Sequence, residues 1–254
     1  MLWRKLKLDW KYALGELVIV TAGVLIALAI DQWNDNRLDL ERERQIIRQI
    51  IQDLDTDIQN VTYAEEGLKR KEVSLLRLQD SLNATDSTAV NGRQLLEDVV
   101  IGANFGWNQG RPQSASFDEA RSSGRFSLIG DFGLRKMTSN YYMNWQDYGH
   151  RSDERETDYP SLSYLLVPRR FITDTKSNIS QTATGQVGIL QFDPNTPADQ
   201  IEDLVRAVKE SNIASYVTGE LNFARFVQVM MADIRNDAVA LRTALDDYLS
   251  SLDH

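Results

Sequence analysis

The sequence lacks cysteine and has little histidine, and both shortages narrow the chemistry that it can carry. Among its 254 residues there is no Cys, and there are only two His, His150 and His254. Disulfides, thiolate zinc sites, iron–sulfur clusters and Cys nucleophiles are therefore excluded. Two histidines also leave few ways to build a His-based active site. Apolar residues make up 42% of the chain and charged residues 26%, which is typical of a folded protein.

Positive charge is also in short supply. The chain carries 28 Lys and Arg against 37 Asp and Glu, a formal net charge of −9 at pH 7. Such a charge balance argues against sequence-independent electrostatic binding to nucleic-acid phosphates. We therefore expect no nucleic-acid partner.

The common catalytic and metal-binding motifs are missing as well. There is no Gly-Lys-Ser/Thr phosphate loop, no Gly-x-Ser-x-Gly elbow and no His-Glu-x-x-His pair. Asp53, Asp55 and Asp57 resemble the start of a calcium loop, but Ile58 stands where that loop needs Gly, and Ala64 where it needs Glu. We interpret the three carboxylates as a solvated helical face. We expect no enzyme, no cofactor and no bound metal.

One long apolar run, Ala13 to Ile30, predicts a transmembrane helix. Its eighteen residues include a single charge, Glu16, and reach the length needed to cross a bilayer. Aromatic residues that suit the two membrane interfaces flank it: Trp3, Trp10, Tyr12 and Trp33. A cleaved signal peptide is the alternative, but Glu16 and the length of the run argue against it. We expect a helix anchored in the lipid bilayer over residues 13–33.

The flanking charges predict the orientation of this helix. Residues 1–12 carry four basic side chains against one acidic side chain, which favours a cytoplasmic N-terminus, although Arg37, Arg42 and Arg44 reduce the asymmetry. The same basic, amphipathic segment suits a position on anionic headgroups. We expect the remainder of the chain to lie outside the cytoplasm.

One face of the predicted span carries polar and small residues. At helical spacing this face contains Glu16, Val20, Gly23, Ala27 and Asp31. Gly23 and Ala27 form a small-xxx-small pair, which lets a second helix approach closely. We expect this face to bind another helix, from a second copy or from another membrane protein. Simple anchoring is the alternative; an ion pathway is disfavoured, because one charged residue on a single span does not form one.

Two seven-residue repeats predict long helices at either end of the remaining chain. The first helix, over residues 34–83, carries apolar side chains at Leu40, Ile47, Leu54, Val61, Leu68, Leu75 and Leu82. The second, over residues 213–254, carries them at Val217, Ala224, Met231, Ala238, Leu245 and Leu252. Neither stripe is stable in water, so we expect the two helices to pack antiparallel, with the chain end returning toward the membrane.

Residues 84–212 predict a smaller, irregular helical insert. Short helices are expected over Arg93–Val100, from the cap at Ser116, from Asp131 to about Tyr148, and after a cap at Thr196. At most Val187–Phe192 is a strand, and the rest of 173–195 is predicted to be loop. The Gly- and Asn-rich loop with Trp107 and Arg111 is a candidate partner loop, or a structural turn. The candidate anion contacts, if the fold brings them together, are Arg121, Arg125, Arg169 and Arg170.

Two stretches resemble a known family. Lys11 to Asp35 (KYALGELVIVTAGVLIALAIDQWND) and Ser116 to Tyr142 (SFDEARSSGRFSLIGDFGLRKMTSNYY) are similar to a family of bacterial membrane-anchored proteins catalogued as domain of unknown function 6090. Ala120 and Arg121 depart from the Glu-Leu usual there. The resemblance implies a bacterial inner-membrane location with this topology, and it implies no activity.

These observations predict an all-α protein: a single N-terminal transmembrane helix, then a long-helix bundle or stalk with the helical insert. We expect a non-enzymatic structural or accessory subunit that assembles through its span and its heptad helices. The alternative is an extracytoplasmic sensor that binds a ligand in its helical domain and needs a partner for output. An enzyme that uses carboxylates alone is a third, less favoured class.

Overall fold

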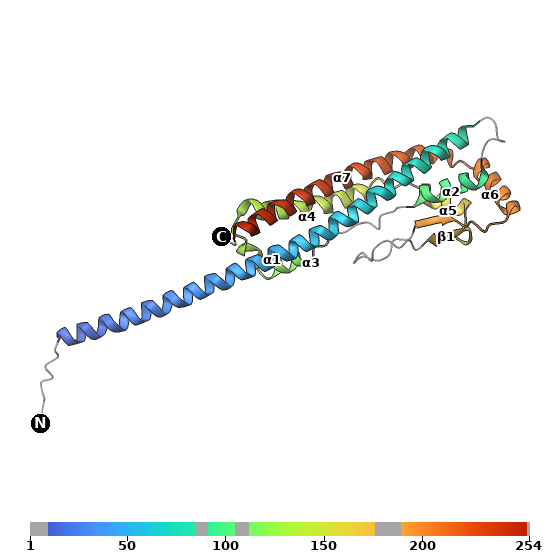
Figure 1. Cartoon of the computed structure of the whole chain (residues 1–254). Coiled ribbons are helices and arrows are strands. Elements are labelled where there is room, and N and C mark those ends of the chain that lie inside the picture. Colours follow the sequence, from blue (N-terminus) through green and yellow to red (C-terminus); the bar gives the residue numbers. More distant parts are fainter. Residues whose placement is uncertain (1–9, 85–90, 105–111, 176–188, 253–254) are drawn as a thin grey trace, which may run out of the picture.

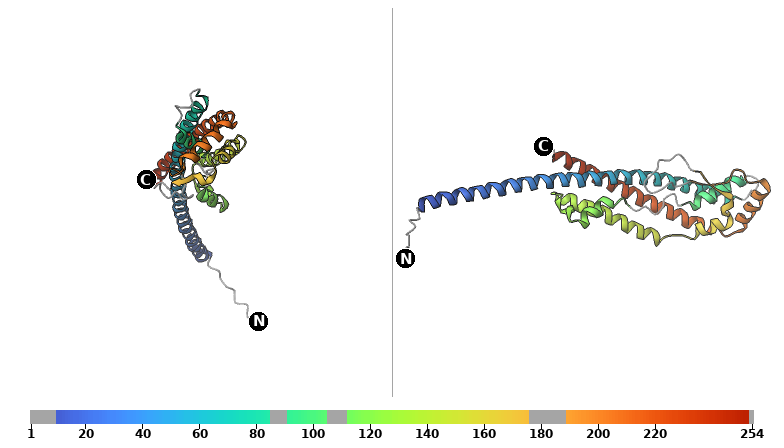
Figure 2. Two further views of the ribbon diagram at one scale, coloured as in Figure 1. Left: turned by 90° about the vertical axis from the view of Figure 1, so that its right-hand side faces the viewer. Right: turned by 90° about the horizontal axis from the view of Figure 1, so that it is seen from below.

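A computed structural model describes residues 10–84, 91–104, 112–175 and 189–252 (Figure 1). Its longest element is α1 (Trp10–Asn83), a single helix of 74 residues. The predicted span and the predicted heptad helix are therefore two stretches of one continuous helix. At ~1.5 Å per residue this helix is about 110 Å long. Its N-terminal stretch projects alone from the rest of the molecule (Figure 2).

The second stretch of α1 packs in a helical bundle. α7 (Ala214–Ser251) runs antiparallel to it, because Gln79 of α1 donates a hydrogen bond to Thr218 at one end, and Arg44 donates to the carbonyl of Leu252 at the other. α4 (Phe132–Asp153), α3 (Ala115–Ser122) and the 3₁₀ helix η2 (Arg125–Leu128) complete this part of the molecule. The C-terminal end of α7 lies where the bundle begins along α1 (Figure 1).

The heptad positions of both long helices form the core of the bundle. Ile47, Leu54 and Val61 of α1 are fully buried there, as are Ala224, Met231, Ala238 and Leu245 of α7. Leu75 and Val217, at the far ends of the two stripes, are also fully buried but belong to a second core. Small and large side chains alternate along the α7 stripe, which lets the two helices interdigitate.

A second, smaller core lies at the end of the bundle far from the N-terminus. It involves α2 (Gly92–Ala103), α5 (Tyr159–Leu166), η3 (Arg169–Phe171) and α6 (Ala198–Glu210). Strands β1 (Ile172–Thr175) and β2 (Ile189–Phe192) pair antiparallel, with Ile172 opposite Phe192. The ring of Tyr159 is completely buried there, and its hydroxyl donates to the carbonyl of Val99 at 3.2 Å.

The all-α prediction is confirmed, and the differences are local. Among the described residues, only the eight of β1 and β2 are in strands. Most of β1 lies in a segment that the sequence predicts to be a loop, because its four polar and β-branched residues show their strand preference only when a partner strand is present. Helix α5 is not predicted from the sequence.

The predicted helix starts differ from the observed ones by up to two residues. Asp131 caps α4 as expected, accepting a hydrogen bond from the amide of Leu134 at 2.9 Å. Ser116 is not a cap, because α3 begins at Ala115. Thr196 is not a cap either: its hydroxyl donates to the carbonyl of Asp193 and forms part of the preceding turn. α6 then begins at Ala198.

The N-terminal stretch of α1 has no cover from the chain itself. Every described side chain from Leu14 to Trp33 is exposed, and the large apolar ones among residues 14–30 are 53–73% exposed. This stretch of α1 is also long and apolar enough to cross a membrane. Elsewhere in the described chain, only scattered large apolar side chains are exposed.

Candidate functional site

The predicted association face lies open along the N-terminal stretch of α1. Glu16, Val20, Gly23, Ala27 and Asp31 are all exposed, and their 4-3-4-4 spacing keeps them on one side of the helix. A Cβ added at Gly23 would meet no atom within 4 Å. No part of the described chain covers this face, so it is available to a partner helix.

The predicted interface anchors and partner loop are described only in part. Trp33 is 65% exposed, and the guanidinium of Arg37 lies 5.8 Å from the centre of its ring. Trp10 and Tyr12 belong to α1, but their side chains lie outside the described residues. Trp3, Trp107 and Arg111 lie outside the described residues altogether. The predictions for these residues stay predictions.

Three buried charges in α1 were not predicted from the sequence. Glu43, Asp57 and Lys71 are 7%, 0% and 2% exposed. They follow one another at intervals of fourteen residues, three positions after the apolar heptad residues. In that second stripe they alternate with the buried residues Ile50, Ala64 and Leu78. This interval is the signal that could have identified them, because polar side chains at core positions of a heptad need partners.

The first buried charge, Glu43, connects three elements at the end of the bundle nearer the N-terminus. The carboxylate of Glu43 accepts hydrogen bonds from the amide of Gly130 at 2.7 Å and from the hydroxyl of Tyr248 at 2.8 Å. Burial and the neighbouring carboxylate of Glu43 raise the pKa of Tyr248. Glu43 therefore ties α1 both to the loop before α4 and to the end of α7.

The second buried charge is the best defined polar site in the bundle. Asp57 accepts hydrogen bonds from the amide of Gln113 at 2.9 Å and from the hydroxyl of Tyr141 at 2.8 Å. Burial raises the pKa of Asp57 to about 6, although both hydrogen bonds act in the opposite direction. The charge of Asp53, one turn earlier, adds to the increase.

The prediction of a solvated face is therefore wrong for Asp57. The spacing indicates correctly that Asp53 and Asp57 share a face, but the segment before α3 and helix α4 cover that face. Asp53 accepts a hydrogen bond from the amide of Ser116 at 3.2 Å, while Asp55 pairs with Arg242 of α7 at 2.7 Å. The three carboxylates thus have no partner in common.

The third buried charge forms an ion pair between the two long helices. The ammonium of Lys71 pairs with the carboxylate of Glu220 in α7, and both side chains are almost completely buried. The hydroxyl of Thr157 donates to the same carboxylate. Burial lowers the pKa of Lys71, and the charge of Glu220 opposes that decrease. Such a pair is costly to break, because one buried charge would be left without the other.

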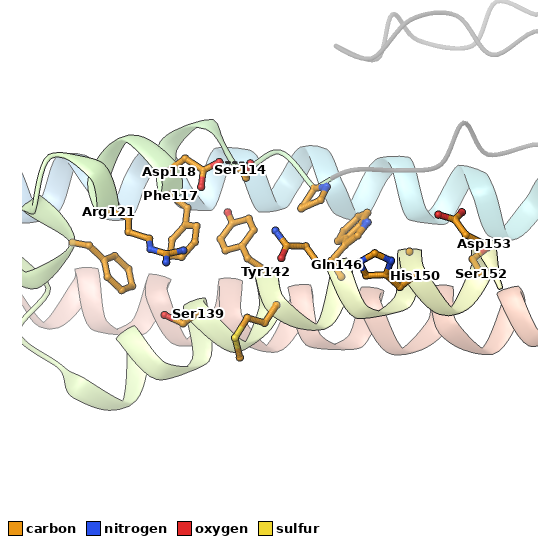
Figure 3. A pocket seen from close by; sticks show the side chains of 15 residues that line it. Ser114, Phe117, Asp118, Arg121, Ser139, Tyr142, Gln146, His150, Ser152 and Asp153 are labelled. Atoms are coloured by element: carbon orange, nitrogen blue, oxygen red, sulfur yellow. Dashed lines mark hydrogen bonds between the residues drawn. The ribbon is translucent and has the colours of Figure 1, made fainter.

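A groove of about 760 Å³ lies between α3 and α4. Its floor is aromatic: Phe117 stacks on Tyr142 with ring centres 4.4 Å apart, and Phe126 meets Phe117 edge-on at 5.2 Å. Polar side chains line the groove along its length, from Arg121 at one end to Asp153 at the other, as Figure 3 shows. They are Ser114, Asp118, Arg121, Ser139, Gln146, His150, Ser152 and Asp153.

The four candidate anion-binding arginines do not form one cluster. Arg125 pairs with Glu119 and also donates to the hydroxyl of Ser123. Arg169 and Arg170 lie beside β1 at the far end of the molecule, over the rings of Tyr164 and Phe171 respectively. Arg121 lines the groove on its own.

A family model matches residues 16–152 of this chain, under the description of a family of unknown function, DUF6090. The match covers more than half of the 254 residues. The chain belongs to this family. The resemblance seen in the span and around α3 is thereby confirmed. No curated protein and no solved structure matches the chain.

The DUF6090 match includes most of the polar features described above. It runs from the association face to the end of α4, and so contains Glu43, Asp57 and Lys71. Of the residues that line the groove, all but Asp153 lie within it. Helix α7, which supplies Glu220, lies outside the match.

Proposed function

We propose that this DUF6090 protein is a non-enzymatic, single-pass membrane protein of the bacterial inner membrane. It acts as an accessory subunit, and it associates with a second copy or with a larger membrane complex through the polar, small-residue face of its span. The observation that carries the proposal is the contrast in cover along α1. The heptad stripe is buried by the chain's own helices, whereas the association face has no cover.

The exposed face suits a helix in lipid. Small residues let two backbones approach closely, and polar side chains in hydrocarbon favour positions between helices. Glu16 and Asp31 lie at the two ends of the face, on either side of the Gly23 and Ala27 pair. Because the heptad stripes pack against each other within the chain, the span is where association with a partner is expected.

The charge distribution supports the proposed topology. Basic residues in segment 1–12 favour a cytoplasmic N-terminus, which places the helical domain outside the cytoplasm. The span would anchor α1, and the bundle would begin near Glu43, ten residues beyond Trp33. At ~1.5 Å per residue this leaves about 15 Å of bare helix between the membrane surface and the bundle.

Native mass spectrometry of the tagged, full-length chain, taken gently from its own membranes, tests this proposal. We expect a defined multimer or a complex with defined extra subunits. The double variant Glu16→Ala, Gly23→Leu should disperse that assembly, because it removes the polar group and blocks the close approach.

A matched control changes the opposite face of the same helix. Val18→Ala with Ala29→Leu alters side chains of similar size about half a turn away, and it should leave the assembly intact. If the assembly survives the Glu16 and Gly23 changes, or if the control disperses it equally, association through this face is wrong.

A further inference from the structure

The groove between α3 and α4 has the features of a ligand site, independent of any association through the span. Its volume of about 760 Å³ falls within the range of sites for small molecules. The groove combines an apolar floor of Phe117, Phe126 and Tyr142 with a few polar groups around it (Figure 3). Sites that bind small molecules show this combination, because apolar contacts supply affinity and polar contacts fix orientation.

The floor of the groove is held in place by the buried polar site of α1. The hydroxyl of Tyr142 donates to the carbonyl of Gln113 at 3.2 Å, and the amide of Gln113 donates to Asp57 at 2.9 Å. Tyr141, the next residue of α4, donates to the other oxygen of Asp57. The segment before α3 and helix α4 are thus fixed to α1 at one point. Ligand binding would therefore not carry the entropic cost of ordering these walls.

Two opposite charges lie one helical turn apart at the α3 end of the groove. Among the described residues, Arg121 is the one Lys or Arg that lines the groove, and no ion pair joins it to another described residue. Asp118 accepts a hydrogen bond from the hydroxyl of Ser114 at 2.6 Å on one oxygen, which leaves its other oxygen available. In Figure 3, Arg121 extends toward Phe117, while Asp118 lies beside Ser114.

The opposite signs of these two charges select the class of ligand. A simple anion would meet Arg121 but would also be repelled by Asp118 and by a chain of net charge −9. A zwitterion satisfies both charges without repulsion. An aromatic body would lie against Phe126, the partly exposed ring of the floor, while Phe117 and Tyr142 are buried beneath it.

We propose that the groove binds an aromatic amino acid at its α3 end. The ligand's carboxylate pairs with Arg121, its ammonium pairs with Asp118, and its ring lies against Phe126. Removing either charge of the ligand leaves one protein charge without a partner, so it should weaken binding by about ten-fold or more.

Fluorine NMR of 4-fluoro-L-phenylalanine with the full-length chain in lipid nanodiscs tests the proposal. We expect the protein to broaden the fluorine line, unlabelled L-phenylalanine to reverse the broadening, and empty nanodiscs to cause none. The N-acetyl derivative, which lacks the ammonium, and the primary amide, which lacks the carboxylate, should each bind about ten-fold more weakly.

Two protein variants assign the charges. Arg121→Gln should weaken binding of the amino acid until it binds no more tightly than the amide. Asp118→Asn should weaken binding of the amino acid until it binds no more tightly than the N-acetyl derivative. Arg125→Gln is the matched control, because Arg125 begins η2 four residues further along the chain, is paired with Glu119 and is not among the groove's lining residues. It should bind like the unaltered chain, and circular dichroism verifies that each variant is folded.

Two results would overturn the proposal. One is the absence of line broadening with the unaltered, folded chain. The other is equal broadening by the amino acid, its amide and its N-acetyl derivative in all variants, which would mean that the ring alone binds. Neither result depends on assembly through the span, so the two proposals stand or fall separately.

Discussion

The two stretches of α1 belong to one helix and have opposite surroundings. From Leu14 to Trp33 every side chain is exposed, although most are apolar. From Glu43 onward the helix buries an apolar stripe and three charges against other elements of the same chain. The comparison shows that a hydrophobic pattern reports only that a side chain needs cover. The cover comes from the chain itself where a partner stripe exists, and we expect it to come from lipid or a partner helix where none does.

The largest expected difference in domain stability comes from placing a charge in each of the two stretches. Leu75 is fully buried and Leu25 is 60% exposed. Leu75→Asp should unfold the helical domain, because burying an unpaired carboxylate costs more than about 5 kcal/mol, close to the whole stability of a domain. Leu25→Asp should leave the domain's melting temperature unchanged in circular dichroism. Equal loss of stability in the two variants would mean that the span is part of the folded core.

The buried ion pair gives the next largest effect. Lys71→Met should cost about 3–5 kcal/mol, because the carboxylate of Glu220 would stay buried without its partner. Replacing Glu220 as well, with Leu, should recover much of this loss. Denaturant unfolding measures both variants. Glu16→Gln, a charge removal in the exposed stretch, should be neutral for domain stability. A fully stable Lys71→Met chain would show that the pair is not needed.

The third comparison concerns pH. The pKa of Asp57 is raised from 3.8 to about 6 in the folded chain, so the folded state holds a proton that the unfolded state has already lost. Stability from this group is full below pH 4 and is lost as the pH rises toward 6, by up to about 3 kcal/mol.

Replacing this carboxyl with an amide tests the assignment. Asp57→Asn retains an acceptor for Gln113 and an amide that donates to Tyr141, but it cannot ionise. In the Asp57→Asn variant, the melting temperature should therefore no longer fall between pH 4 and 6 through this group. Asp31→Asn, in the exposed stretch, should leave the decline unchanged. An identical pH profile for Asp57→Asn and the unaltered chain would mean that Asp57 does not titrate there.

The smallest expected difference in domain stability is between alanine substitutions at two glycines. A Cβ at Gly102 would lie 2.7 Å from Leu75 and 2.8 Å from the hydroxyl of Tyr159, whereas one at Gly23 would meet nothing within 4 Å. Gly102→Ala should therefore destabilise the domain by about 1–3 kcal/mol. Gly23→Ala should not alter domain stability. Thermal unfolding of both variants measures the difference, and an unchanged Gly102→Ala domain would contradict the close contact.

Local patterns could predict the main helices but not the polar contacts between them. The spacing of Leu54 and Leu75 indicates a buried stripe, since helical periodicity depends only on neighbours in the chain. The partners of Asp57 lie 56 and 84 residues away, at Gln113 and Tyr141, and no local rule brings them together.

The groove could not be predicted for the same reason. It needs α3 and α4 to face each other, and the sequence alone does not specify that packing. Arg121 and Asp118 could be placed on one helix, but their position over an aromatic floor depends on the fold.

The first stretch of α1 is expected to be covered by a membrane. Alkaline carbonate extraction of membranes that contain the full-length, C-terminally tagged chain is a direct test. We expect the tag to stay in the membrane pellet, because a spanning helix is not released when peripheral proteins are stripped. Recovery of the intact chain in the supernatant would contradict it.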